Sequence, residues 1–245
     1  MTSTFAKMLP RDGTNAIWKA LLGRSPTALE GQVSEVELKA QQLLSAEEEG
    51  VNGLYFPISC VICRLVTLPE GTSVKVSVVG REGMVGSPAL FGSSASTFRT
   101  VVQFPGRALV LPISETKRLL DHPTLEQVLF RYTLLLLREA SLTAACNRSH
   151  AAKQRLARWL LLIRDRADRN EFPLTHESLS AMLGVRRERV SVSAKELRGA
   201  GAIEYRRATV SITNRSELKK QSCSCYAAIT DSYATFLQTE LAGLT

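Results

Sequence analysis

Residues 187–195 place hydrogen-bonding groups on one side of a segment with helical periodicity. At 100° per residue, the apolar side chains of this segment and its continuation fall on one stripe: Val190, Ala194 and Leu197. The sector beside that stripe carries a guanidinium, a carboxylate, a hydroxyl, an isopropyl and an ammonium group, from Arg187, Glu188, Ser191, Val192 and Lys195. Such a face can donate to and accept from the polar groups of a partner. The pattern therefore indicates recognition chemistry.

The recognition face lies within a helix-turn-helix pattern at 174–203. Thr175 is a candidate N-cap of a first helix, and Glu177 follows in the first turn, where the helix dipole favours an acid. Gly184 and Val185 then break the apolar periodicity as a tight turn would. This order is typical of DNA-binding helix-turn-helix units. The alternative is an ordinary helical hairpin with a solvated basic face.

A β-hairpin is predicted directly after the second helix. Two short alternating runs at 202–205 and 209–212 are joined by Arg206, Arg207 and Ala208. A basic turn of this kind next to a helix-turn-helix is the pattern of a DNA-binding wing.

The positive charge of the chain belongs to this C-terminal part. The chain has 245 residues and a net charge of +8, and residues 148–220 hold 17 Lys and Arg against 8 Asp and Glu. The rest of the chain is therefore close to neutral. A phosphate backbone is the partner that best explains such an asymmetry.

The cysteines and histidines show no convincing metal-site spacing. Cys60 and Cys63 have C-x-x-C spacing, but side chains alternate along a strand, so we expect the two to face opposite sides. Cys223 and Cys225 are either a thiol switch or an inert pair in the tail. The three histidines are isolated from any ligand set, and the second of them is expected to cap a long helix: His122, His150 and His176. The sequence therefore predicts no metal and no cofactor.

Enzyme and membrane classes find no support. The sequence contains no G-x-S-x-G, no HExxH and no P-loop, so we predict that the protein is not an enzyme, although an active site inside the N-terminal strands is the alternative. Residues 1–10 lack the apolar core of a signal peptide, and the apolar run at 134–137 is far too short to span a bilayer. Five scattered cysteines favour a reducing compartment, so we expect a cytoplasmic protein without a membrane partner.

The hydrophobic period changes along the chain and predicts an α+β protein. An arm at 1–30, with a short helix at 15–23, precedes short strands separated by Gly, Pro and Asn turns, which indicate an all-β barrel or sandwich at 31–113. Helices at 114–150 follow, the longest from about 124 to 147. A winged helix-turn-helix domain is expected at 151–221 and a tail of unassigned role at 222–245.

Two helices carry further expectations. The apolar surface of the long helix is wider than one stripe, so we expect it to pack on the barrel and on a second copy of itself; the alternative is a helix wholly buried within one domain. In the next helix, at 151–167, four arginines are expected to face mostly outward: Arg155, Arg158, Arg164 and Arg166.

The order of strands, long helix and winged helix resembles the Crp/Fnr family of bacterial transcription regulators. The stretches that carry the resemblance are YFP at 55–57, GREGMVG at 80–86, QRLARWL at 154–160 and LGVRRERV at 183–190. The resemblance covers roughly residues 30–220. It implies an N-terminal β-barrel of the cyclic-nucleotide-binding jelly-roll type, a long dimerisation helix and a C-terminal winged helix-turn-helix that binds double-stranded DNA as a homodimer. RNA polymerase and a small-molecule effector are further candidate partners.

The resemblance also implies roles for single residues. The family's base-reading Arg-Glu pair falls on Arg187 and Glu188, and these groups suit guanine O6/N7 and cytosine N4. Ser191 lies on the same face, and a further family arginine is replaced by Val192, which predicts a different half-site. Arg186 stands where the family has a capping Ser or Thr. Candidate phosphate contacts are Arg186, Arg189, Lys195, Arg206 and Arg207.

The effector site departs from the cyclic AMP pattern. Alignment through 86–91 puts Ser87 at the position of the family's ribose-binding Glu, and Thr97 near its phosphate-binding Arg, with Arg99 two residues away. A phosphate without a cationic partner would lose its hydration uncompensated. We therefore expect a regulator whose effector is not cyclic AMP. The alternatives are a cyclic-nucleotide-responsive regulator and a non-specific architectural DNA-binding protein.

Overall fold

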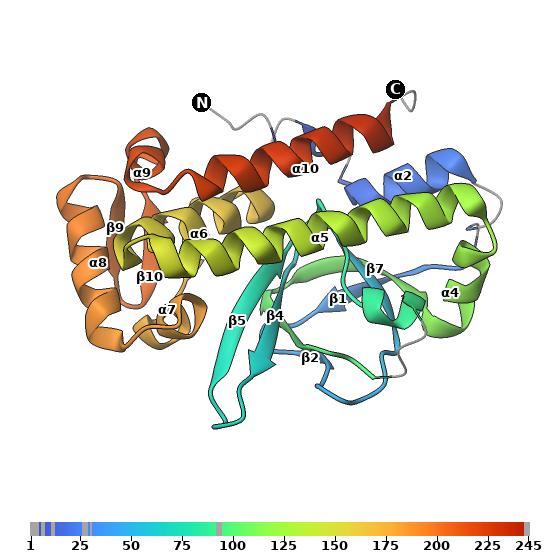
Figure 1. Ribbon diagram of the computed structural model, residues 1–245, viewed down its shortest axis with the longest axis horizontal. Coiled ribbons are helices and arrows are strands. Elements are labelled where there is room, and N and C mark those ends of the chain that lie inside the picture. Colours follow the sequence, from blue (N-terminus) through green and yellow to red (C-terminus); the bar gives the residue numbers. More distant parts are fainter. Residues whose placement is uncertain are drawn as a thin grey trace.

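A computed structural model describes residues 5, 8–10, 13–25, 29, 31–91 and 95–242 of the chain. One long helix, α5 (Pro123–Ser149), runs through the molecule and joins a β-rich N-terminal part to a helical C-terminal part (Figure 1). The last helix, α10 (Cys225–Leu241), lies alongside α5 and is drawn in red above it (Figure 1). The expected order of strands, long helix and winged helix is confirmed.

The N-terminal part is a roll of two antiparallel sheets. Its strands are β1 (Ser34–Leu38), β2 (Leu43–Ser45), β3 (Gly53–Pro57), β4 (Val61–Thr67), β5 (Ser73–Val79), β6 (Arg99–Phe104) and β7 (Gly106–Pro112). The sheet orders are β1-β7-β3 and β2-β6-β4-β5. Both sheets contribute to one buried cluster, which includes Leu38, Ile62 and Val102, so they pack face to face on a shared apolar core. No strand pairing joins the two sheets into a closed barrel among the described residues, which corrects the barrel expectation. The short 3-10 helix η1 (Ser87–Phe91) follows the roll's first five strands.

The two cysteines of the C-x-x-C stretch point to different cores, as alternation along a strand predicts. Cys60 belongs to the cluster inside the roll, whereas Cys63 belongs to the larger cluster that the roll shares with the helices. Burial raises the pKa of the Cys63 thiol to about 11 and that of Cys60 to about 12. Both groups are therefore neutral apolar fillers at physiological pH.

A tight turn at 80–83 joins the roll to α5. Tyr132 of α5 is fully buried, and its hydroxyl donates to the Met84 carbonyl at 3.0 Å and accepts from the Met84 amide at 2.9 Å. A Cβ at Gly83 would collide with the Tyr132 hydroxyl, so this position requires glycine. The arm is anchored at the same turn, because Asn15 caps α2 (Ala16–Arg24) and donates to the Gly83 carbonyl at 2.8 Å.

The C-terminal part is a winged helix-turn-helix. It consists of α6 (Ala152–Ala167), β8 (Glu171–Pro173), α7 (His176–Leu183), α8 (Arg187–Gly199), β9 (Ile203–Arg206), β10 (Thr209–Ile212) and α9 (Arg215–Gln221). The predicted hairpin of β9 and β10 is confirmed. Sequence analysis missed β8, a three-residue strand that pairs with the outer edge of β10.

The tail and the connecting helix α4 (Ile113–Leu120) both pack against α5. Residues 225–241 form α10, which packs on α5, α2 and α6. Near the end of α10 the buried Glu240 pairs with Arg24 at 2.6 Å and with Arg131 of α5 at 2.9 Å. One long side of α5 is therefore covered by the chain's own C-terminal helix. No helix in the described part of the chain combines the length and apolarity needed to cross a membrane.

The expectation that the arginines of α6 face outward was wrong for three of the four. Arg158 is fully buried, and Arg155 and Arg166 are buried as well, whereas Arg164 is half-buried. The amphipathic interpretation assumed one solvent face. However, α6 packs against α8 and α9 of its own domain, against α10, and against strands β4 and β5 of the roll. A helix surrounded in this way buries polar groups together with apolar ones, and each buried cation then needs partners.

Arg166 finds its partners at the meeting point of four segments. Its guanidinium lies 2.7 Å from Glu82 of the 80–83 turn and 3.0 Å from Glu139 of α5, and the Tyr233 hydroxyl of α10 donates to Glu139 at 2.7 Å. Burial raises the pKa of Glu82 although Arg166 acts against it. Burial also acts to raise the pKa of Glu139, but Arg166 and Tyr233 outweigh it and hold that pKa below its ordinary value. We call Arg166, Glu82, Glu139 and Tyr233 the central junction.

We predict that Arg166→Met lowers the free energy of unfolding by about 3–5 kcal/mol at pH 7, because it leaves two buried carboxylates without a cation. Without Arg166, burial raises both carboxyl pKa values, so the folded state takes up protons more readily than the unfolded chain as the pH falls. In the unaltered protein, the lowered pKa of Glu139 means that this carboxylate stabilises the folded state at neutral pH. That stabilisation is lost as the pH falls. The difference between the two proteins should thus shrink towards about pH 4.

Urea unfolding at several pH values measures this prediction. Arg148→Met is the matched control, because Arg148 is exposed in the last turn of α5. That control should change stability by no more than about 0.5 kcal/mol. A loss below about 1 kcal/mol for Arg166→Met, or a loss independent of pH, would show that the central junction contributes little.

Candidate nucleic-acid interface

Helices α7 and α8 meet at a short turn that local sequence determines. The Thr175 hydroxyl accepts from the Ser178 amide at 3.0 Å, which confirms Thr175 as the N-cap of α7. Gly184 ends α7 in the left-handed conformation at φ 61°, which favours glycine. Arg186 precedes α8 in extended conformation without a side-chain cap, so its long side chain stays exposed and available.

The outer face of α8 is exposed, and its inner stripe is buried. Val190, Ala194 and Leu197 pack into the core, as their spacing predicts. The candidate base-reading residues and one candidate phosphate ligand all have exposed side chains: Arg187, Glu188, Ser191, Val192 and Lys195. Val192 is 49% exposed, which is unusual for a large apolar side chain and leaves its methyl groups open to a partner. We call these five residues the outer face of α8.

Two of these side chains have partners on α7. Arg187 lies 3.2 Å from Glu177, with 62% and 76% of the two side chains exposed. An ion pair this exposed contributes about 0–1 kcal/mol, so Arg187 can exchange Glu177 for another acceptor at little cost. The Ser191 hydroxyl donates to the Arg187 carbonyl at 3.1 Å and lies 3.2 Å from His176 Nδ1. Helix α7 thus orients two groups of the outer face.

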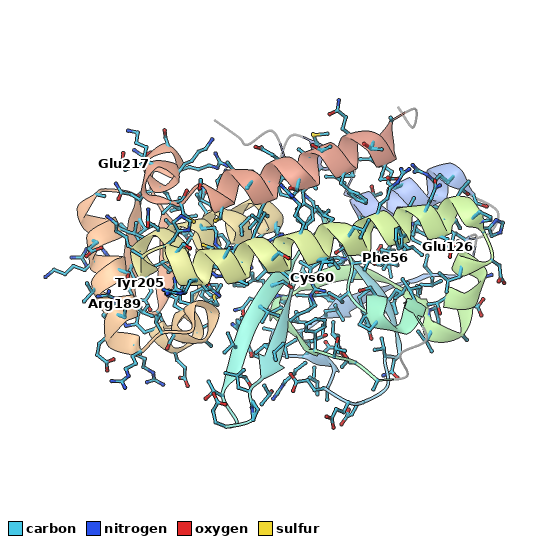
Figure 2. All side chains as sticks on the ribbon, in the orientation of Figure 1. Phe56, Cys60, Glu126, Arg189, Tyr205 and Glu217 are labelled. Carbon is cyan, nitrogen blue, oxygen red and sulfur yellow. The ribbon has the colours of Figure 1, made fainter. Side chains whose placement is uncertain are left out.

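The other candidate phosphate ligands are exposed on or just before α8 and at the wing. Arg189 is exposed on the flank of α8 that faces the start of α6, where it lines a small hollow together with Lys153. Figure 2 shows Arg189 and Tyr205 at the end of the molecule that the winged helix forms. Arg206 and Arg207 are exposed at the tip of the wing, and Arg206 lies 3.4 Å from Glu204.

The wing is held against α7 by contacts that sequence analysis missed. The rings of His176 and Tyr205 stack with centroids 4.7 Å apart, and the Tyr205 hydroxyl donates to the Leu174 carbonyl at 3.0 Å. Arg207 and Ala208 both have positive φ, at 48° and 61°, so they form a two-residue turn of the type that matches strand twist. The basic turn is therefore held close to α7, on the same domain as the outer face of α8.

The roll contacts the helix-turn-helix directly. Lys75 of β5 donates to the Ser178 hydroxyl of α7 at 2.9 Å and to Gln103 of β6 at 2.5 Å. A hollow between the end of the β4–β5 hairpin and the start of α8 is lined in part by Leu68, Val74, Arg186 and Arg187. The hairpin of the roll therefore lies beside the residues proposed to meet DNA.

A cavity of about 440 Å³ lies between the roll and α5. Its polar lining includes Arg64, Ser77, Ser87, Thr133 and Glu139, and the rest is mostly apolar. Of the three effector candidates, Ser87 lies in this lining. The two other effector candidates, Thr97 and Arg99, are exposed and do not belong to the lining.

Arg64 is the cavity residue that sequence analysis missed. It donates to the Ser77 hydroxyl at 2.7 Å and lies over the Phe98 ring at 5.1 Å. The signal was present, because Arg64 is the one charged residue in the otherwise apolar run 60–66. The sequence alignment offered no cationic partner for a phosphate here, whereas the structure places Arg64 in the lining of the cavity.

Comparisons with known proteins give two family matches and many related structures. Residues 35–122 match the cyclic nucleotide-binding domain, and residues 154–221 match the Crp-like helix-turn-helix domain. A search of curated protein sequences found no match to the chain.

Among solved structures, a CRP/FNR family transcriptional regulator from Thermus thermophilus is 21% identical, with a TM-score of 0.65 over 77% of this chain and 98% of that one. FixK2 from Bradyrhizobium japonicum is 17% identical, with a TM-score of 0.66 over 78% of this chain and 98% of that one. A regulator of the same family from Eubacterium rectale is 14% identical, with a TM-score of 0.67 over 84% and 96% of the two chains. At these identities the structures establish a shared fold.

Proposed function

Because the chain belongs to the Crp/Fnr family of transcriptional regulators, we propose that it binds specific DNA sequences as a homodimer. The observation that carries this proposal is the outer face of α8. There Arg187, Glu188, Ser191 and Val192 are all exposed on one helix that a capped turn positions. A helix with this face fits the major groove, where base edges offer complementary donors and acceptors.

In this proposal each exposed residue of α8 contacts a different group on the DNA. Arg187 leaves Glu177 and donates two bonds to guanine O6 and N7, and Glu188 accepts from cytosine N4. Ser191 contacts either kind of base, and Val192 meets a thymine methyl group. Five cations of the domain contact phosphates and fix the register without reading sequence: Lys195 of the outer face, together with Arg186, Arg189, Arg206 and Arg207.

The proposed dimer contact is the exposed apolar stripe of α5. Phe130, Leu134 and Leu137 are 56%, 51% and 63% exposed, at the i, i+4, i+7 spacing of one helical face. The roll and α10 cover other sides of α5, so a second copy of the same stripe is the partner that a two-fold dimer would supply. A dimer would present two copies of the outer face of α8, one for each half-site of the DNA.

The proposed effector site is the cavity between the roll and α5. A ligand there would contact Thr133 and Glu139 of α5 as well as the roll, and so would influence the dimer helix. We propose an effector other than cyclic AMP. Ser87 offers no carboxylate to a ribose, and Glu139 is already engaged by Arg166 and Tyr233. Arg64 favours a ligand with one acidic group. The competing hypotheses are a cyclic-nucleotide-responsive regulator and an architectural protein without sequence preference.

We predict that selection from random duplexes recovers a two-fold symmetric site with half-sites about one helical turn apart. Specific binding should exceed non-specific binding at least about 10³-fold. Arg187→Ala should cost about 1–3 kcal/mol at the selected site, and Lys195→Ala should weaken all sequences and lower the salt slope by about one. Arg107→Ala is the control, since Arg107 is an exposed arginine on β7 that pairs with Glu35. A specific-to-random ratio below about tenfold would select the architectural hypothesis.

We expect Leu134→Glu to produce a monomer in sedimentation experiments, because two glutamates would be buried facing each other across the two-fold axis. DNA affinity at the symmetric site should fall with it. Leu43→Glu is the matched control, because Leu43 is a similarly exposed leucine on β2 of the roll. A protein that is monomeric before substitution, or a Leu134→Glu variant that still dimerises, would refute this assignment of the interface.

Calorimetric titration tests the effector proposal. Cyclic AMP at millimolar concentration should give no binding heat and no change in Tm. Saturable binding of cyclic AMP that Arg64→Ala abolishes would instead establish the cyclic-nucleotide-responsive alternative. Arg107→Ala again controls for the loss of one positive charge.

A further inference from the structure

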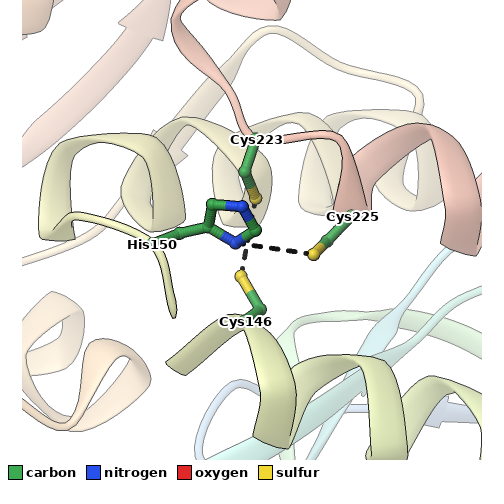
Figure 3. Close-up of side chains that lie close together, drawn as sticks. All are labelled: Cys146, His150, Cys223 and Cys225. Carbon is green, nitrogen blue, oxygen red and sulfur yellow. Dashed lines mark hydrogen bonds between the residues drawn. The ribbon is translucent and has the colours of Figure 1, made fainter. Parts of the chain in front are cut away.

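Three cysteines and a histidine from distant parts of the sequence converge beside the joint between α5 and α6. Cys146 is in the last turn of α5, His150 is the residue that ends this helix, and Cys223 and Cys225 precede and begin α10. Figure 3 shows the three sulfur atoms and the imidazole ring facing one another. Sequence analysis predicted no metal site because the spacing of 73 residues between His150 and Cys223 gave no sign of this meeting.

The distances among the four side chains fit one tetrahedral ion. The Cys146 and Cys223 sulfurs are 3.5 Å apart, Cys225 Sγ lies 3.7 Å from His150 Nδ1, and one ligand atom from each residue lies within 4.8 Å of all the others. Zinc bonds are about 2.3 Å to sulfur and about 2.0–2.1 Å to nitrogen. In a tetrahedral site they place two sulfurs about 3.8 Å apart, and a sulfur and a nitrogen about 3.6 Å apart. We propose that Cys146, His150, Cys223 and Cys225 form a structural Zn²⁺ site.

The charges around the cluster support an anionic complex. Arg158 is fully buried, and two of its nitrogens, Nε and Nη2, have no hydrogen-bond partner among the described residues. Its third nitrogen, Nη1, donates to the neutral Thr143 hydroxyl at 3.1 Å. The positive charge of Arg158 lies close enough to the cluster to act on the sulfur groups of Cys146, Cys223 and Cys225.

The balance of charge explains why the buried Arg158 guanidinium would favour an anionic zinc–thiolate complex beside it. When Zn²⁺ binds, the three sulfurs bind as thiolates, any thiol protons pass to solvent, and the imidazole binds as a neutral ligand. The complex then carries a charge of −1. A buried guanidinium without a carboxylate partner is costly, and an anionic zinc–thiolate centre next to it offsets that cost.

Other uses of the four groups fit the geometry less well. A four-iron cluster requires ligands spread around a cube of iron and sulfide, wider than these four atoms lie. A disulfide between Cys146 and Cys223 would need the sulfurs to approach from 3.5 Å to about 2.05 Å and would leave Cys225 and His150 without a role. The cluster accepts a single ion with the smallest rearrangement.

The position of the site gives it a structural consequence. His150 lies between the end of α5 and the start of α6, so the ion would tie this joint to the first residue of α10. From there α10 runs along α5 and supplies Tyr233 to the central junction. The zinc site therefore holds the start of the tail helix in place.

The test is the metal content of the full-length protein purified under reducing conditions and reconstituted with Zn²⁺. We expect about one zinc ion per chain, with X-ray absorption at the zinc edge showing three sulfurs and one nitrogen in the unaltered protein. Cys223→Ser and His150→Ala should weaken zinc affinity at least about tenfold. Cys60→Ser is the matched control, because Cys60 is a buried cysteine in the core of the roll, and it should keep its zinc.

Hydrogen exchange gives a second readout that does not depend on a variant. Removal of zinc by a chelator should speed exchange in the first turns of α10 and leave the roll unchanged. A protein that takes up no zinc under reducing conditions, that forms a Cys146–Cys223 disulfide instead, or that contains iron and labile sulfide would overturn the proposal. Zinc retained at full affinity by Cys223→Ser would do the same.

Discussion

The arrangement of the whole molecule depends on the buried cation of Arg166. A guanidinium without water is tolerable only beside anions, and Glu82 and Glu139 supply two of them at 2.7 Å and 3.0 Å. These three groups come from α6, from the turn of the roll and from α5, and Tyr233 adds α10 to the same site. Moving any one of these charged groups away would leave another charge buried without a counter-charge. The four segments are therefore held in one arrangement.

This arrangement decides which surfaces remain free. Helix α10 and the roll cover two sides of α5 and leave the apolar stripe of Phe130, Leu134 and Leu137 exposed. Helix α6 is enclosed by its neighbours, and α8 lies at the end of the molecule away from the strands of the roll (Figure 1). In the same arrangement β5 lies against α7, where Lys75 donates to the Ser178 hydroxyl.

Glu139 connects the cavity with the DNA-binding domain. Glu139 is one of the residues that line the space between the roll and α5, and its carboxylate pairs with Arg166 of α6. A ligand that alters the hydrogen bonds of Glu139 would therefore act on the cation that holds the winged helix in place. The cluster of Cys146, His150, Cys223 and Cys225 lies at the other end of α6, so the two ends of this helix are fixed by different chemistry.

Local patterns in the sequence determined the elements and several of their ends. The change from alternation to helical period located the roll, α5 and α8, and Thr175, Gly184 and the 206–208 turn have the expected places because caps and turns depend on neighbours in the chain. Only the tertiary structure decided the environment of the polar groups. Arg158 and Arg166 are buried, Arg64 faces a cavity, and Cys146 meets Cys223, because burial and pairing depend on segments far away in the sequence. A periodicity of one helix cannot reveal how many neighbours surround it.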